Sequence, residues 1–143
     1  MARVRDLVLD RVLFHVEENE TVAGVARQMA AVHVGAIVVL RDGQLRGVFS
    51  ERDLMLRVVL PRLDPESTPV RTVMSTQVST VDESASLEEA WEAMHNHNCR
   101  HLPVTREGRV VGFLSMRDLM DYELARKTEE LRHMHAYLHG SGA

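Results

Sequence analysis

Apolar residues recur at helical spacing in two segments of the chain. In residues 20–34 (ETVAGVARQMAAVHV) and residues 85–98 (ASLEEAWEAMHNHN), apolar side chains fall three or four positions apart. This is the period of an α-helix with one buried face, so both segments are predicted to be amphipathic helices. Ser86, followed three positions later by Glu89, resembles a capping box at the start of the second helix.

Shorter apolar runs with turn residues between them predict β-strands. Residues 35–40 (GAIVVL) and 101–105 (HLPVT) read as buried strands, and Asp42-Gly43 and Glu107-Gly108 follow them as turns. Two returning strands and two short leading segments complete the pattern, and these are residues 44–50, 109–115, 13–22 and 77–87. Ser50 and Ser115 then stand where helices over residues 51–60 and 116–125 would begin, which makes both serines N-cap candidates.

The chain repeats itself. Residues 38–55 (VVLRDGQLRGVFSERDLM) match residues 103–120 (PVTREGRVVGFLSMRDLM) at an offset of 65 positions without a gap. Shared turn glycines and a shared Arg-Asp-Leu-Met run indicate two copies of one supersecondary unit. The predicted order of elements is therefore β-α-β-β-α, twice.

The repeat also suggests the domain organisation. We expect unit one over residues 1–62, unit two over residues 63–122 and a helical tail over residues 123–143. Residues 61–70 (PRLDPESTPV) hold three of the four prolines and are the expected linker between the units.

The run Gly-apolar-apolar-Ser-x-x-Asp-Leu appears as GVFSERDL (47–54) and again as GFLSMRDL (112–119). Two such runs in register, each closing a β-α-β-β-α unit, resemble a tandem pair of CBS (cystathionine β-synthase) domains over residues 4 to 122. The resemblance implies an α/β (α+β) fold of two CBS units in a pseudo-two-fold pair, here with an added C-terminal helix. It also implies two clefts between the units, where many members bind adenine nucleotides.

The Ser-x-x-Asp spacing suits such a ligand. A serine at the N-cap and an aspartate at the third helical position point toward the same helix end, where backbone N–H groups and the helix dipole favour a phosphate. By resemblance, Asp53 and Asp118 are expected to take the ribose hydroxyls. The expected nucleotide-binding residues are Ser50, Arg52, Asp53, Arg100, His101, Ser115, Arg117 and Asp118. The alternative is that the serines and aspartates only cap their helices and that the arginines are solvated.

The segment HNHNCRH (95–101) holds three histidines and the only cysteine of the chain. A zinc site needs three or four ligands that converge, and the predicted helix through His95 breaks their alignment. We therefore expect no metal there and assign a phosphate contact to Arg100 and His101 by resemblance. Unit one offers only Gly35 and Ala36 at the matching positions, so the two clefts should be unequal.

The tail is predicted to be helical as far as Gly140. Met120, Leu124, Leu131, Met134 and Leu138 follow a heptad-like spacing, which Lys127 interrupts at one core position. A stripe this narrow predicts packing on the parent domain or on a second copy of the chain, and the resemblance to CBS pairs favours a homodimer. A different target protein is the remaining alternative. His135 and His139, four positions apart, have a spacing that a metal could use, but no further ligand lies near them in sequence.

Composition and motif content argue against several classes of function. The net charge of −4, with both signs interspersed, gives no support for nucleic-acid binding, and no apolar run approaches the length of a membrane span. One cysteine and no visible signal peptide fit a cytoplasmic protein. No phosphate loop, nucleophile elbow or HExxH motif appears, so an enzyme is not expected and no cofactor is required.

The sequence thus favours a free-standing regulatory module with AMP, ADP or ATP as its ligand and an unknown downstream protein as its partner. A ligand-free interaction or dimerisation module and a metal-responsive protein are the alternatives.

Overall fold

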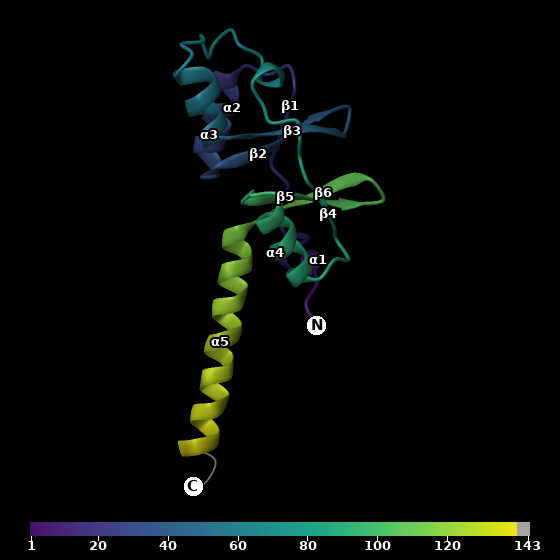
Figure 1. The fold of residues 1–143 in the computed structure, drawn as a ribbon, viewed down its shortest axis with the longest axis vertical. Helices are drawn as coiled ribbons and strands as arrows, with labels where there is room; N and C mark the ends of the chain where they lie inside the picture. Colours follow the sequence, from purple (N-terminus) through teal and green to yellow (C-terminus); the bar gives the residue numbers. More distant parts are fainter. Residues whose placement is uncertain (140–143) are drawn as a thin grey trace.

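The computed structural model describes residues 1–139, in which two three-stranded sheets lie one above the other along the length of the molecule (Figure 1). The elements of unit one are β1 (His15–Glu17), α2 (Val22–Val32), β2 (Ala36–Arg41), β3 (Gln44–Ser50), α3 (Glu51–Leu54) and the π-helical turn η1 (Met55–Val59). Those of unit two are β4 (Val81–Asp82), α4 (Leu87–Asn96), β5 (His101–Arg106), β6 (Arg109–Ser115) and α5 (Met116–His139). Two short helices precede the first strands, α1 (Val4–Val8) and the 3-10 turn η2 (Val70–Thr72). The predicted β-α-β-β-α order is confirmed in both units.

Each sheet has the same topology. The middle strand, β2 or β5, runs parallel to the first strand and antiparallel to the third. The hairpins turn at Asp42-Gly43 and at Glu107-Gly108, where all four residues have a positive φ between 50° and 80°. This is the type I′ turn, whose twist matches that of the flanking strands, so the two turn predictions are confirmed.

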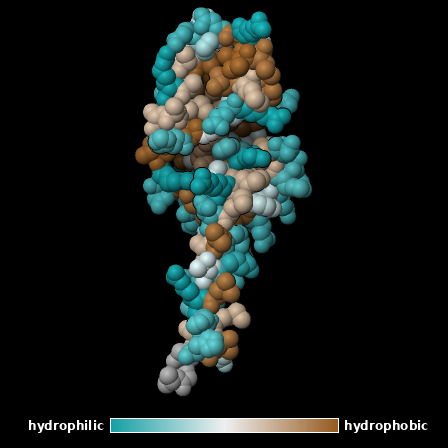
Figure 2. All heavy atoms as spheres, turned by 90° about the vertical axis from the view of Figure 1, so that its left-hand side faces the viewer, coloured by the Kyte–Doolittle hydropathy of each residue, from teal (hydrophilic) through white to brown (hydrophobic). Residues whose placement is uncertain are grey.

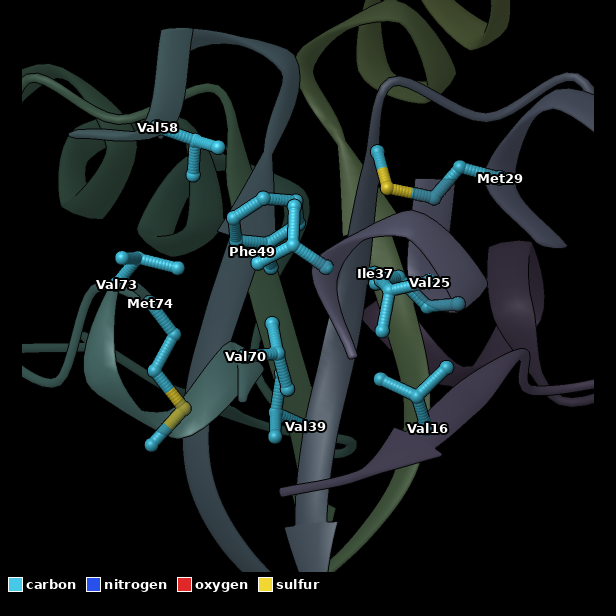
Figure 3. Packing of buried hydrophobic residues seen from close by; sticks show 11 residues of the cluster. Val16, Val25, Met29, Ile37, Val39, Phe49, Val58, Val70, Val73 and Met74 are labelled. Atoms are coloured by element: carbon cyan, nitrogen blue, oxygen red, sulfur yellow. The ribbon is translucent and has the colours of Figure 1, made fainter. Parts of the chain in front are cut away.

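The core of unit one includes residues from beyond its own strands and helices. Phe49 and Ile37 lie at its centre and are almost completely buried. Val70, the last residue of the proline-rich segment, and Val73 and Met74 just beyond it pack into the same cluster (Figure 3). The predicted linker is therefore part of the packed structure of unit one.

The core of unit two likewise includes a segment from outside its own strands and helices, namely helix α1. Val4 and Val8 of α1 are buried in the core of unit two, beside β5 and β6. We call residues 4–11 and 70–75 the exchanged segments. Equivalent backbone bonds attach them: Val4 N to Ala85 O (2.9 Å), Arg5 N to Glu83 O (2.9 Å), Val70 N to Glu20 O (2.8 Å) and Arg71 N to Glu18 O (3.0 Å). Each unit is thus finished by the segment that leads into the other one. The predicted boundary at residue 62 stays a prediction, since packing crosses it in both directions.

The motif glycines make this exchange possible. A Cβ atom on Gly47 would stand 2.5 Å from the Ser75 carbonyl oxygen and 2.9 Å from the Met74 sulfur. A Cβ atom on Gly112 would stand 2.8 Å from a methyl group of Val8. These two glycines therefore let the exchanged segments lie directly against β3 and β6.

The last helix of each unit departs from the expected form. After one α-helical turn, residues 55–59 of unit one form a π-helical turn, closed by a 3.0 Å bond from Leu60 N to Met55 O. The wider turn accompanies burial of Val58 in the core and a 2.9 Å bond from Arg57 to the Met74 carbonyl.

In unit two the last helix continues without a break into the predicted tail, so α5 runs for 24 residues and projects from the body (Figure 1). Gly140, its predicted end, lies outside the described residues. None of the helices within residues 1–139 combines the length and apolarity that crossing a membrane requires.

Candidate functional site

Asp53 stands at the start of α3 and is almost fully buried. Its Oδ2 accepts hydrogen bonds from the Ser50 backbone N–H and hydroxyl, both at 3.0 Å, and its Oδ1 accepts one from the Ser75 hydroxyl at 3.0 Å. Ser50 in turn accepts a bond from the Asp53 N–H, so the two residues form a capping box. The predicted N-cap is confirmed, and the carboxylate is engaged by unit one and its exchanged segment.

Asp118 occupies the same position at the start of α5 and keeps more exposure, with 22% of its side chain accessible. Ser115 caps the helix by accepting from the Asp118 N–H at 3.0 Å, and its own N–H donates to Asp118 at 2.8 Å. Arg11 completes the site with two parallel bonds, from Nη1 to Oδ1 at 2.9 Å and from Nη2 to Oδ2 at 3.1 Å. Both carboxylate oxygens are thus held by one guanidinium group.

The electrostatics of Asp118 follow from this contact. Burial alone raises the pKa of the Asp118 carboxyl, but the hydrogen bonds from Arg11 and Ser115 outweigh it and leave the pKa below its usual range. The folded protein therefore favours the ionised carboxylate, and this contribution to stability is lost as pH falls through the lowered pKa. Asp118 is an anion at neutral pH, which is the form that accepts hydroxyl hydrogen bonds.

His101 lies at the start of β5 and stacks on Phe113 of β6, with ring centroids 5.1 Å apart. Burial lowers the pKa of His101, and the neighbouring Arg100 lowers it further, while the charges of Asp118 and of Glu51 act in the opposite direction. The neutral imidazole therefore predominates at neutral pH and can form a hydrogen bond but supplies no full charge.

The three arginines of the predicted site lie at the surface. Arg52 and Arg100 are exposed, and the side chain of Arg117 is 89% exposed, with its Nε 4.0 Å from Asp121. Their assigned role as phosphate contacts stays a prediction. Asp118, Ser115 and His101 come together at one helix start, and Asp53 and Ser50 come together at the other.

The histidine-rich segment does not gather into a ligand set. Helix α4 ends at Asn96, and Cys99 packs partly buried against the core of unit two. Burial raises the pKa of the Cys99 thiol, which disfavours the thiolate that binds metal. Farther along α5 the His135 and His139 rings lie 4.6 Å apart. Within residues 1–139, three or more potential metal-binding side chains are not found together.

Two hollows open on the helical side of the molecule. One, of about 430 Å³, lies between α2 and α3 and is bordered by Gly35 and Glu51. The other, of about 420 Å³, lies between α4 and α5 and is lined by Leu87, Trp91 and Met120 among others. Neither hollow is lined by Asp53 or Asp118.

Sequence reasoning missed Arg11 and Ser75, the residues that cover the carboxylates. Arg11 lies in the segment that leads into unit one but contacts unit two. Ser75 lies in the segment that leads into unit two but contacts unit one. One signal was present in the sequence, since the dipeptide Val-Arg occurs at residues 4–5 and again at residues 70–71 and marks the start of each segment.

Comparison with known proteins agrees with this architecture. A model of the CBS domain matches residues 4–60 and again residues 70–125. The CBS domain-containing protein YhcV of Bacillus subtilis is 33% identical over 128 residues, which make up 90% of either chain.

Two solved structures share the fold. A CBS domain protein from Pyrobaculum aerophilum, solved in complex with AMP, has a TM-score of 0.73 at 32% identity and covers 82% of this chain and 89% of its own. Hypoxic Response Protein I, solved with two coordinated zinc ions, has a TM-score of 0.74 at 28% identity and covers 85% of this chain and 99% of its own. With two matched domains, two copies of the Ser-x-x-Asp helix start and the shared fold, the chain belongs to the CBS-domain family as a tandem pair.

Proposed function

We propose that this protein is a regulatory module that binds an adenine nucleotide or another adenosyl compound at the interface between its two CBS units. The ribose of the ligand binds to Asp118, and the bound state is relayed to a partner through a change in the arrangement of the units. The observation that carries the proposal is the ionised, partly exposed Asp118 carboxylate at the start of a long helix. The AMP complex of the Pyrobaculum aerophilum relative supports the choice of ligand.

The helix start of unit two is better suited to bind the ligand than that of unit one. Its carboxylate keeps 22% exposure, whereas the side chain of Asp53 keeps 10%. A ribose diol donates two hydroxyl hydrogen bonds, and Asp118 offers two oxygens on one face for them. The helix dipole of α5 adds a favourable field for a nearby phosphate. We therefore infer one strong site in unit two and a weaker site, or none, in unit one.

Replacement of Asp118 by Ala is expected to weaken AMP binding at least about 30-fold, because the ribose loses both of its acceptors. Isothermal titration calorimetry measures this directly. Asp121→Ala is the matched control: it removes the same charge from the same helix at an exposed position, and its affinity should equal that of the native protein. Native affinity in the Asp118 variant would contradict the site assignment.

A dimerisation role is the second candidate, and one observation favours it. The stripe along α5 is exposed throughout, with Met120 57%, Leu124 68%, Leu131 66%, Met134 60% and Leu138 67% accessible. Apolar side chains recur down this helix and gather in a second patch over unit one (Figure 2). A surface of this kind is typical of a protein contact, and we infer that a second copy of the chain covers the α5 stripe.

The double substitution Leu124→Glu and Leu131→Glu is expected to convert such a dimer to a monomer, because it places charge in the contact. Sedimentation equilibrium gives the mass before and after. Ala125→Glu with Ala136→Glu adds the same charge to the same helix off the stripe and should leave the dimer intact. A native protein that sediments as a monomer would remove this candidate while leaving the proposed ligand site untouched.

A further inference from the structure

The segment between α1 and β1 passes from unit two to unit one, and Arg11 is its side-chain attachment to the ligand site. Besides its two bonds to Asp118, Arg11 donates a 3.3 Å bond from Nη2 to the Phe113 carbonyl of β6. Its own side chain stays 44% exposed. The Arg11 side chain therefore holds the carboxylate while remaining partly open to solvent.

The equivalent attachment in unit one is of another kind. Ser75 forms two backbone bonds with Val48 of β3, from Val48 N to Ser75 O at 3.0 Å and from Ser75 N to Val48 O at 2.9 Å. Its hydroxyl then reaches Asp53 at 3.0 Å. In unit one the covering group is anchored through the main chain. In unit two it is held by one partly exposed side chain, which can rotate away without breaking a backbone–backbone hydrogen bond.

We propose that Arg11 is a releasable latch on the ligand site of unit two: it holds the two oxygens of Asp118 that the ribose diol of an adenosyl ligand takes, so that ligand binding expels it. This inference rests on the proposed function. A carboxylate whose two oxygens accept parallel hydrogen bonds from one guanidinium group has no comparable face left for a diol. The ligand and Arg11 therefore compete for Asp118.

Release of Arg11 from Asp118 changes how the segment between the two units is held. Residues 9–14 are joined at one end to α1, which is buried in unit two, and at the other to β1 of unit one. When Arg11 leaves Asp118, this crossing segment loses its ion pair with unit two and gains freedom to move. Competition at Asp118 thereby changes the connection between the two units.

Adenosine is the appropriate probe, because it carries the ribose diol and has no phosphate that a freed Arg11 could contact. Arg11→Ala is expected to bind adenosine about two- to fivefold more tightly than the native protein, since an exposed ion pair of this kind no longer has to be broken. Arg5→Ala removes the same charge from α1 and should leave the affinity unchanged. In the native protein, adenosine should also increase hydrogen exchange at residues 9–14.

The outcomes separate the latch from the binding site itself. Adenosine binding that is equal or weaker in Arg11→Ala overturns the latch and leaves the proposed function standing. Binding by the variant alone supports the latch and means that the native cleft is held closed. If neither protein binds adenosine, both proposals fail. Arg11→Lys keeps the charge without the paired geometry and should show a smaller gain; it provides the test should Arg11→Ala not fold.

Discussion

Replacement of Gly47 by Ala is expected to lower the free energy of unfolding by about 3 kcal/mol, the upper end of the usual cost of overpacking. The added methyl group would meet the Ser75 carbonyl oxygen at 2.5 Å, and a main-chain atom cannot turn aside as a flexible side chain can. Relief requires the segment at Ser75 to move off β3, which breaks its two bonds with Val48 and withdraws its hydroxyl from Asp53. Urea denaturation followed by circular dichroism measures the loss.

Gly35→Ala is the matched control for this substitution. A methyl group there would lie 3.5 Å from the Glu51 side chain, an ordinary contact with a flexible group, and the equivalent position in unit two already holds Arg100. Its unfolding free energy should change by less than about 1 kcal/mol. Equal losses of unfolding free energy in Gly47→Ala and Gly35→Ala would show that Met74 and Ser75 do not lie directly against β3.

The double substitution of Val4 and Val8 by Ala is expected to cost about 3 kcal/mol or more, although both residues lie more than seventy positions before β4 in the chain. Both side chains are buried in unit two, and the change removes four methyl-sized groups at about 0.8 kcal/mol each, before any cavity cost. Hydrogen exchange should show the loss of protection in β5 and β6 ahead of the strands of unit one.

Val12→Ala tests the same segment at a position that is 76% exposed and should leave stability and exchange nearly unchanged. A loss of protection centred on unit one in the Val4 and Val8 variant would contradict the exchange. It would mean that α1 supports the unit that follows it in sequence.

The element order was accessible from the sequence because the turn and helix-start signals are local and recur in a second copy. Asp42-Gly43 and Glu107-Gly108 define hairpin turns, Ser50 and Ser115 accept the first helical N–H groups, and the offset of 65 residues places one unit on the other. Local rules of this kind involve residues a few positions apart. The π-helical turn was not accessible, because it depends on how Val58 meets the finished core.

Part of the candidate site could also be predicted, because some of its residues are close together in the sequence. Ser115 and Asp118 are three residues apart, so their pairing follows from helix geometry alone. Arg11 meets Asp118 across 107 positions, and nothing in its local sequence distinguishes it from the other arginines near the N-terminus. Helix α1 was not predicted, and the spacing of Val4 and Val8 does not say against which unit they would be buried.

The exchange of leading segments also orders events during synthesis of the chain. Unit one is complete once residue 75 has left the ribosome, so it can fold while unit two is still being made. Helix α1 emerges before either unit, yet its binding surface in unit two includes Leu114 and Leu119, which are translated about a hundred residues later. We therefore expect the apolar face of α1 to stay unpaired until the strands and the last helix of unit two have been synthesised.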